Sequence, residues 1–263
     1  MAVVTRFAPA PTGYLHIGHV VNALHVWGTA RARNGRVLLR IEDHDGQRSR
    51  RGYEVSILED LAWLGFAPDA PMVRQSERGP VYQAALDRLR RDGLVYACEC
   101  SRRDIAEAGG AGEELRYPGT CAGKGLAEAP GCALRVRLPA SQERFDDRLL
   151  GPQVQVPSEQ CGDLLIRDRL GFWTYQFAVT ADDLDQGVNL VVRGTDLLSS
   201  TGRQIQLARL LGRTQPPQFM HHGLVMKSAG QKVSKSDGDT GIREMRAAGM
   251  SAQGVLAAAS RWL

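Results

Sequence analysis

Residues Arg6–His19, which read RFAPAPTGYLHIGH, constrain the fold of this chain more than any other segment. The pattern predicts a short strand over residues 2–8, a tight loop containing proline and glycine, and a helix over residues 17–33. His16 and His19 lie where this helix begins. A helix N-terminus presents unpaired N–H groups and the positive end of the helix dipole, and both attract phosphate. The segment therefore predicts a phosphate site at the first helical turn.

The two histidines have a structural alternative. As capping or packing residues they would only stabilise the helix, whereas as donors they could follow charge that develops on a triphosphate. Gly18 carries no Cβ, so an adenine ring can lie against the backbone there. Because His-x-Gly-His follows Pro-x-Pro-x-Gly, we interpret His16, Gly18 and His19 as part of an ATP site.

Strands and helices alternate along the rest of the chain. The segment RVLLRI is apolar enough to be a central strand of a parallel sheet, and the order strand, helix, strand, helix predicts an α/β fold. Residues 101–132 are rich in Gly, Glu and Ala with little periodicity, which indicates an insertion. We expect strands at residues 2–8, 36–41, 94–98, 133–138, 163–168 and 189–198, and helices at residues 17–33, 52–64, 79–91, 200–211 and from about 241.

A second segment with phosphate chemistry lies near the end of the chain. Of the 33 basic residues four are lysines, and two of these, Lys232 and Lys235, share the glycine-bordered segment KVSKS. Two lysines and two hydroxyls on a mobile loop could close over a triphosphate, although a solvated basic loop is the alternative. Neither G-x-G-x-x-G nor G-x-x-x-x-G-K-[ST] occurs, so a dinucleotide dehydrogenase or a P-loop enzyme has no support.

Composition restricts the remaining classes. The net charge of +4 is weak support for a polyanionic partner, and no run of about 18 apolar residues predicts a membrane span. The N-terminus does not read as a secretory signal, so we expect a cytoplasmic protein. Five cysteines, an odd number, argue against a disulfide framework and leave metal binding or simple burial.

Three of these cysteines have metal-ligand spacing. Cys98 and Cys100 form a C-x-C pair, and Cys121 could add a third thiolate to Zn²⁺. A fourth ligand is required, and Tyr117, Cys132, an acidic side chain or water could supply it. Buried free cysteines are the alternative.

The segments HIGH at His16–His19 and KVSKS at Lys232–Ser236 resemble the HIGH and KMSKS motifs of class I aminoacyl-tRNA synthetases. The resemblance implies a Rossmann-type catalytic domain, ATP with Mg²⁺ as substrate, and an aminoacyl-adenylate intermediate. It gives catalytic roles to His16, His19, Lys232 and Lys235, with Lys235 stabilising the triphosphate in the transition state.

Other segments are similar to those of glutamyl-type enzymes, since RFAPAPTG and RIEDHD resemble RFAPSPTG and RIEDTD. The anionic side chain of glutamate needs an arginine, and its α-ammonium group needs a carboxylate at the end of a central strand. Surface ion pairing is the alternative for Glu42 and Arg193, and the family's usual serine is replaced by Ala10. The implied glutamate pocket is lined by Arg6, Ala8, Ala10, Glu42, Tyr175 and Arg193.

The chain ends 27 residues after Ser236, without anticodon-binding helical domains. It therefore resembles the short glutamyl-synthetase paralogues, which attach glutamate to the queuosine base in the anticodon of tRNA(Asp). These paralogues carry C-x-C…Y-x-x-x-C, which favours Tyr117 as the fourth ligand of a structural zinc.

The resemblance implies a monomer with tRNA(Asp), L-glutamate and ATP as partners. The alternatives are a truncated enzyme that charges a tRNA 3′ end, an RNA-binding paralogue without catalysis, and a nucleotidyltransferase for another small substrate. We expect two catalytic halves at residues 1–97 and 161–215, an insertion at 98–160, and a KVSKS loop with a helical stem-contact segment at 216–263.

Overall fold

The computed structural model describes residues 2–108, 114–228, 231–232 and 241–263. Its first sheet is parallel, in the order β1 (Val4–Phe7), β2 (Arg36–Ile41) and β3 (Val73–Arg74). Helix α1 (Ile17–Arg31) connects the first two strands and packs on them through Val26 and Trp27. The chain leaves this helix through Asn34, whose φ of 50° is left-handed and suits the Asn-Gly pair.

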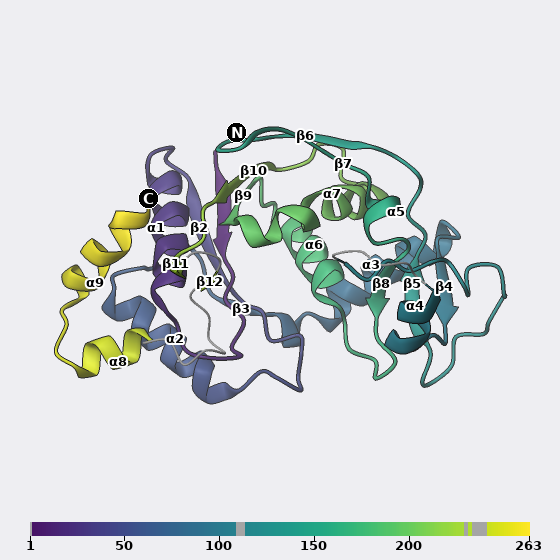
Figure 1. The fold of residues 1–263 in the computed structure, drawn as a ribbon, viewed down its shortest axis with the longest axis horizontal. Coiled ribbons are helices and arrows are strands. Elements are labelled where there is room, and N and C mark those ends of the chain that lie inside the picture. Colours follow the sequence, from purple (N-terminus) through teal and green to yellow (C-terminus); the bar gives the residue numbers. More distant parts are fainter. Residues whose placement is uncertain (1, 109–113, 229–230, 233–240) are drawn as a thin grey trace.

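A second sheet continues this layer. Strand β9 (Leu190–Gly194) pairs in parallel with β10 (Gln218–His222), which pairs in parallel with β6 (Glu143–Asp147), and β7 (Gly151–Gln155) runs antiparallel at the edge. Strand β9 lies beside β1, where the Asn189 N–H donates to the Val4 carbonyl oxygen at 3.0 Å. The predicted α/β fold with a parallel sheet is therefore confirmed, and its two halves meet at β1 and β9 (Figure 1).

A separate antiparallel sheet lies at the opposite end of the molecule from the C-terminal helices (Figure 1). It is made of β4 (Val95–Cys98), β5 (Ala133–Val136) and β8 (Leu164–Arg167). Of the strands in this antiparallel sheet, only β5 lies wholly inside the range 98–160 expected for the insertion. Strands β6 and β7 also lie in that range, but they belong to the sheet with β9. The proposed domain ranges remain predictions.

Helices pack against these sheets, and short strands or helices form the remaining connections. Helix α3 matches its predicted range, α2 is shifted by one residue, and the predicted helical tail is formed by α8 and α9. The remaining elements are α2 (Arg51–Trp63), α3 (Gly79–Arg91), α4 (Arg102–Ala108), α5 (Pro157–Gln160), α6 (Tyr175–Asp185), α7 (Thr201–Leu210), β11 (Met226–Ser228), β12 (Gln231–Lys232), α8 (Ile242–Ala247) and α9 (Ala252–Ala259).

Two main clusters of buried apolar side chains hold these layers together. One joins α1, β1, β2 and the C-terminal helix α9 through residues such as Phe7, Val26 and Val255. The other joins α3, α6 and α7 to the antiparallel sheet through residues such as Leu86 and Phe177. In the described part of the chain, no helix has the length and apolar character that crossing a membrane requires.

Candidate active site and thiol cluster

The predicted HIGH segment forms the cap of α1. The Nδ1 atom of His16 accepts the Gly18 N–H at 3.1 Å, and Nδ1 of His19 accepts the His16 N–H at 3.0 Å. Because Nδ1 is an acceptor in both rings, each neutral imidazole carries its hydrogen on Nε2. The cap therefore fixes two Nε2–H donors at the helix N-terminus, and the ring centroids lie 3.9 Å apart. Capping and phosphate binding are compatible here.

The chain that follows the KVSKS segment packs beside this cap. His16 forms an isolated antiparallel bridge with Gly241, and the Ile242 N–H donates to the Leu15 carbonyl oxygen at 2.8 Å. Lys232 ends β12, which pairs with β11 at Met226, but its side chain is not described. Lys235 lies outside the described residues.

Three buried charges join the two halves of the fold behind the predicted glutamate pocket. Asp183 on α6 accepts Nε–H of Arg6 at 3.2 Å and an N–H of Arg40 at 2.8 Å. Burial opposes ionisation of Asp183, but the two guanidinium groups outweigh it and lower its pKa. The charge of Arg6 is thus already balanced by a carboxylate, and neither Arg40 nor Asp183 was identified from the sequence.

Glu42 follows β2 directly, as expected for a ligand residue at the carboxyl end of a central strand. Its N–H donates to the Pro9 carbonyl oxygen at 3.0 Å, which places it against the loop that holds Ala8 and Ala10. Burial raises the pKa of Glu42, although Arg40 at 3.2 Å counteracts the effect. An ammonium group placed beside Glu42 would stabilise its ionised form.

Arg193 is the residue before the last one of β9 and is only 3% exposed. Its guanidinium donates to His221 Nε2 at 3.0 Å, to Gln204 Oε1 at 2.7 Å and to Thr201 Oγ1 at 2.9 Å. Tyr175 begins α6, and burial raises the pKa of its hydroxyl, with a further contribution from the charge of Glu42. The charge of Arg193 acts on Tyr175 as well, so Glu42, Tyr175 and Arg193 lie near one another.

The three thiols predicted to bind a metal lie together. The Sγ atoms of Cys98, Cys100 and Cys121 are within 4.8 Å of one another, and those of Cys100 and Cys121 are 3.5 Å apart. Tyr117 Oη lies 3.5 Å from Cys98 Sγ and accepts the Cys121 N–H at 2.8 Å. This group could hold a metal ion, and Cys132 is not part of it.

The surroundings of the thiol cluster favour ionisation of Cys98, whereas burial and the neighbouring thiols of Cys121 and Cys98 raise the pKa of Cys100 to about 11. Arg135 places Nε 3.4 Å from Cys98 Sγ and its guanidinium carbon 3.6 Å from the Tyr117 ring centroid. Burial opposes ionisation of Cys98, but hydrogen bonds from Tyr117 and Arg135 outweigh it and lower its pKa. Thiolates are the form in which cysteine binds metals.

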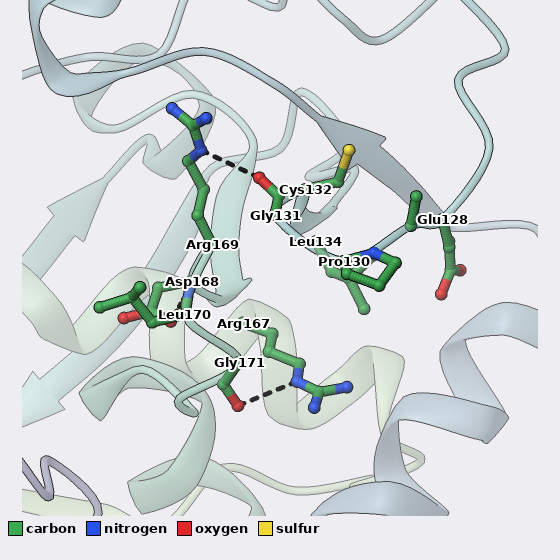
Figure 2. Close-up of a pocket in the computed structure, with 11 residues that line it drawn as sticks. Glu128, Pro130, Gly131, Cys132, Leu134, Arg167, Asp168, Arg169, Leu170 and Gly171 are labelled. Carbon is green, nitrogen blue, oxygen red and sulfur yellow. Dashed lines mark hydrogen bonds between the residues drawn. The ribbon is translucent and has the colours of Figure 1, made fainter.

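Two cavities border the turn that follows β8. One of about 910 Å³ reaches from His44 and Tyr175, past Phe172 and Leu170, to Cys100 of the thiol cluster. The other, of about 470 Å³, lies between this turn and residues 128–134 (Figure 2). Figure 2 shows Arg169 donating to the Gly131 carbonyl oxygen, at 3.0 Å, with Cys132 on the rim. The turn at 168–171 therefore forms a wall common to both cavities.

The structure thus brings most of the predicted pocket together, while the roles of its residues remain predictions. Arg40 and Asp183 escaped the sequence analysis, although each is a charge within an apolar segment, RVLLRI and FAVTADDL. His221 escaped it too, because its partners Asp147 and Arg193 are 74 and 28 residues away in sequence. A charged residue inside an otherwise apolar strand or helix was the sequence signal that could have identified Arg40 and Asp183.

Comparison with known proteins places this geometry in a family. Residues 2–261 match the family model of the catalytic domain of class I tRNA synthetases (E and Q). A glutamyl-Q tRNA(Asp) synthetase of Burkholderia cenocepacia is 44% identical over 244 residues, which cover 90% of this chain and 81% of that protein. A protein of the same name from Bordetella bronchiseptica is 46% identical over 241 residues, with 89% and 75% covered.

Among solved structures, a glutamate tRNA ligase from Elizabethkingia meningosepticum in complex with its amino acid is similar, with a TM-score of 0.78 and 29% identity. The match covers 91% of this chain and 53% of that one, so the chain spans about half the length of the ligase. Both the sequence and the fold lead to one assignment. The chain belongs to the class I tRNA synthetases of the E and Q group.

Proposed function

We propose that this protein activates L-glutamate with ATP and transfers it to the queuosine base in the anticodon of tRNA(Asp). The observation that carries the proposal is the 44–46% identity, over about 90% of the chain, to proteins named glutamyl-Q tRNA(Asp) synthetase. Identity to the glutamate tRNA ligase is lower, at 29%. The relatives therefore favour tRNA modification over charging of a tRNA 3′ end. We further propose that it acts as a cytoplasmic monomer.

The glutamate site would use opposite charges at two strand ends. The carboxylate of Glu42 would accept the α-ammonium group, and the guanidinium of Arg193 would bind the side-chain carboxylate, with Tyr175 between them. Ala8 and Ala10 would form the backbone wall, and Arg6 would shape the pocket while its own charge is balanced by Asp183. A charge-assisted pair at each end of the ligand would fix its orientation.

Activation would require attack of the glutamate α-carboxylate on the α-phosphate of ATP. A bond to phosphorus forms, the bond to the bridging oxygen breaks, and pyrophosphate leaves with its Mg²⁺. The Nε2–H donors of His16 and His19 would bind the triphosphate beside Gly18, and Lys232 and Lys235 would stabilise the charge that develops on it. The protein would contribute positioning and electrostatic stabilisation.

In the second step a hydroxyl of the cyclopentene diol would attack the activated carbonyl, forming an ester and releasing AMP. The cavity of about 910 Å³ offers a place for this acceptor, because Tyr175 borders both the glutamate pocket and the cavity. Its volume falls within the range of about 300–1,000 Å³ found for small-molecule sites. Phe172 and Trp173 on its wall supply aromatic surface against which a base can stack.

We propose that the thiol cluster binds one structural zinc through Cys98, Cys100, Cys121 and Tyr117. Tetrahedral zinc places ligand sulfurs about 3.8 Å apart and a sulfur and an oxygen about 3.5 Å apart, given bond lengths of about 2.3 and 2.0 Å. The separation of 3.5 Å between Cys98 Sγ and Tyr117 Oη fits this geometry. The ion would fasten a segment with a small apolar core of its own.

The test combines activation and transfer. We expect glutamate-dependent ATP–pyrophosphate exchange without tRNA, and much weaker exchange with glutamine or aspartate. Labelled glutamate should then enter tRNA(Asp) that contains queuosine and not tRNA(Asp) that lacks it. Periodate treatment beforehand, which oxidises cis-diols, should abolish labelling, and nuclease mapping should place the label in the anticodon. Label at the 3′ end of unmodified tRNA(Glu) would instead support the charging enzyme.

A further inference from the structure

The guanidinium of Arg193 is held entirely differently from that of Arg6. It donates to an imidazole nitrogen of His221, an amide oxygen of Gln204 and a hydroxyl of Thr201, at 2.7 to 3.0 Å. Among the described residues, no salt bridge within 4.0 Å involves Arg193, whereas Arg6 contacts the Asp183 carboxylate at 3.2 Å. Arg193 thus keeps a buried positive charge that no carboxylate in contact cancels.

The hydrogen bonds determine the protonation of His221. Arg193 can only donate, so His221 Nε2 must accept, and the imidazole hydrogen must lie on Nδ1. That hydrogen is donated to Asp147 Oδ2, which lies 2.6 Å from Nδ1. A second hydrogen on Nε2 would face the Nε–H of Arg193. Burial and the charge of Arg193 accordingly lower the pKa of His221 to about 4.

Asp147 is fixed in turn by the backbone. Its carboxylate accepts the N–H groups of His221 at 3.1 Å, Leu149 at 3.0 Å and Leu150 at 3.1 Å. These residues lie on neighbouring parallel strands, since His221 of β10 is in register with Arg193 of β9 and Asp147 ends β6. The imidazole therefore lies between the Asp147 carboxylate and the Arg193 guanidinium. It keeps the carboxylate from pairing directly with the guanidinium and cancelling its charge.

We propose that His221, Gln204 and Thr201 are positioning residues that determine specificity, because they fix Arg193 through neutral acceptors and leave its charge for the ligand. Asp147 sets the tautomer of His221 that this requires. The inference rests on the proposed function and deepens it. The preference for the anionic glutamate side chain over the neutral glutamine side chain would depend on this neutral set, as well as on the arginine itself.

The sharpest test is the isosteric change Gln204→Glu, which puts a carboxylate 2.7 Å from the Arg193 guanidinium. We expect the KM for glutamate to rise about tenfold or more, and the ratio of kcat/KM for glutamate over glutamine to fall by a similar factor, with the KM for ATP little changed. Pyrophosphate exchange measures each quantity. The matched control is Gln206→Glu on the same helix, which is also buried but whose amide contacts Pro139 and Ser141.

The control should keep the amino-acid ratio within about twofold of wild type, since it also buries a carboxylate on α7 but does not touch Arg193. A second measurement needs no catalysis. In histidine-labelled protein, ¹⁵N NMR at pH 7 should show His221 with hydrogen on Nδ1, its signals assigned through their loss in His221→Gln. An unchanged ratio in folded Gln204→Glu, or hydrogen on Nε2, would overturn the inference. Absence of glutamate-dependent exchange in wild type would instead refute the proposed function.

Discussion

At the start of α1, a Cβ added to Gly18 would lie 3.0 Å from Cε1 of His16, closer than ordinary contacts. Gly18→Ala should therefore displace the imidazole that accepts its own N–H. We expect pyrophosphate exchange to fall about tenfold, because a misplaced donor loses its stabilisation of the transition state. Enzyme kinetics with saturating glutamate would measure the effect on kcat and on the KM for ATP.

The matched control for this change is Gly28→Ala in the same helix. Nothing lies within 4 Å of a Cβ added there, and the residue is exposed. Alanine should raise the free energy of unfolding by up to about 1 kcal/mol without changing activity, because glycine is a poor helix residue. Equal activity in both variants would show that His16 does not act through its position at the cap.

The sequence identified ligand-like charges but could not rank them. Arg6 and Arg193 were equal candidates for the glutamate side chain, because both follow from the same chemical requirement. The structure separates them through Asp183, which is 177 residues away from Arg6 in sequence. Which arginine keeps its charge is decided by tertiary contacts, and these have no local signal in the sequence.

Among the elements, those with a strong local pattern were predicted well. Strand β2 and helix α3 have the predicted bounds, since an apolar run and a helix with Gly-Pro at its start and Gly93 at its end are local signals. The strand expected over residues 189–198 ends earlier, at Gly194, and continues as a 3-10 helix. Strands β6 and β7 were missed because ERFDD and GPQVQ carry mostly polar residues and gain their structure from pairing.

The contact between the thiol-bearing segment and β8 depends on Gly162. Its φ is 67°, and a Cβ there would meet the Tyr117 carbonyl oxygen at 2.0 Å. Gly162→Ala should therefore separate Tyr117 from the three thiols. We expect bound zinc to fall well below one ion per chain and the free energy of unfolding to drop by about 3 kcal/mol or more. Elemental analysis and urea unfolding would measure both.

The control for backbone strain is Gly187→Ala. Its φ of 66° is nearly the same, but nothing lies within 4 Å of the added Cβ. It should cost about 1–2 kcal/mol, the ordinary penalty for a left-handed residue, and leave the zinc content unchanged. If both variants kept full zinc, Gly162 would have no role in the thiol cluster. Zinc loss in Gly187→Ala as well would mean that general destabilisation releases the ion.

On the scale of the whole molecule, buried polar contacts join the two halves of the sheet. Asn189 bonds to Val4 where β9 meets β1, and Arg40 of β2 contacts Asp183 of α6 at 2.8 Å. His25 of α1 stacks on His222 of β10 with ring centroids 4.6 Å apart. The ligand-binding residues proposed above lie along this junction, so the stability of the junction and the geometry of the pocket are linked.

The histidines at this junction should make stability depend on pH. Burial lowers the pKa of His25 to about 4, with a contribution from His222, and burial with the charge of Arg193 lowers that of His221 to about 4. In the unfolded chain both imidazoles titrate near the ordinary histidine pKa of about 6.5. The unfolded state therefore binds more protons between these values, and the free energy of unfolding increases with pH there.

The stabilisation should be complete above about pH 6.5 and should be lost progressively as the pH falls towards 4. Urea unfolding at pH 7.5, 6, 5 and 4.5 would measure this slope. His25→Gln should remove up to one proton of uptake, which corresponds to about 1.4 kcal/mol per pH unit near pH 5. Because glutamine does not titrate in this range, the variant separates His25 from the other groups. An unchanged slope of stability against pH in His25→Gln would contradict a neutral His25 at the junction.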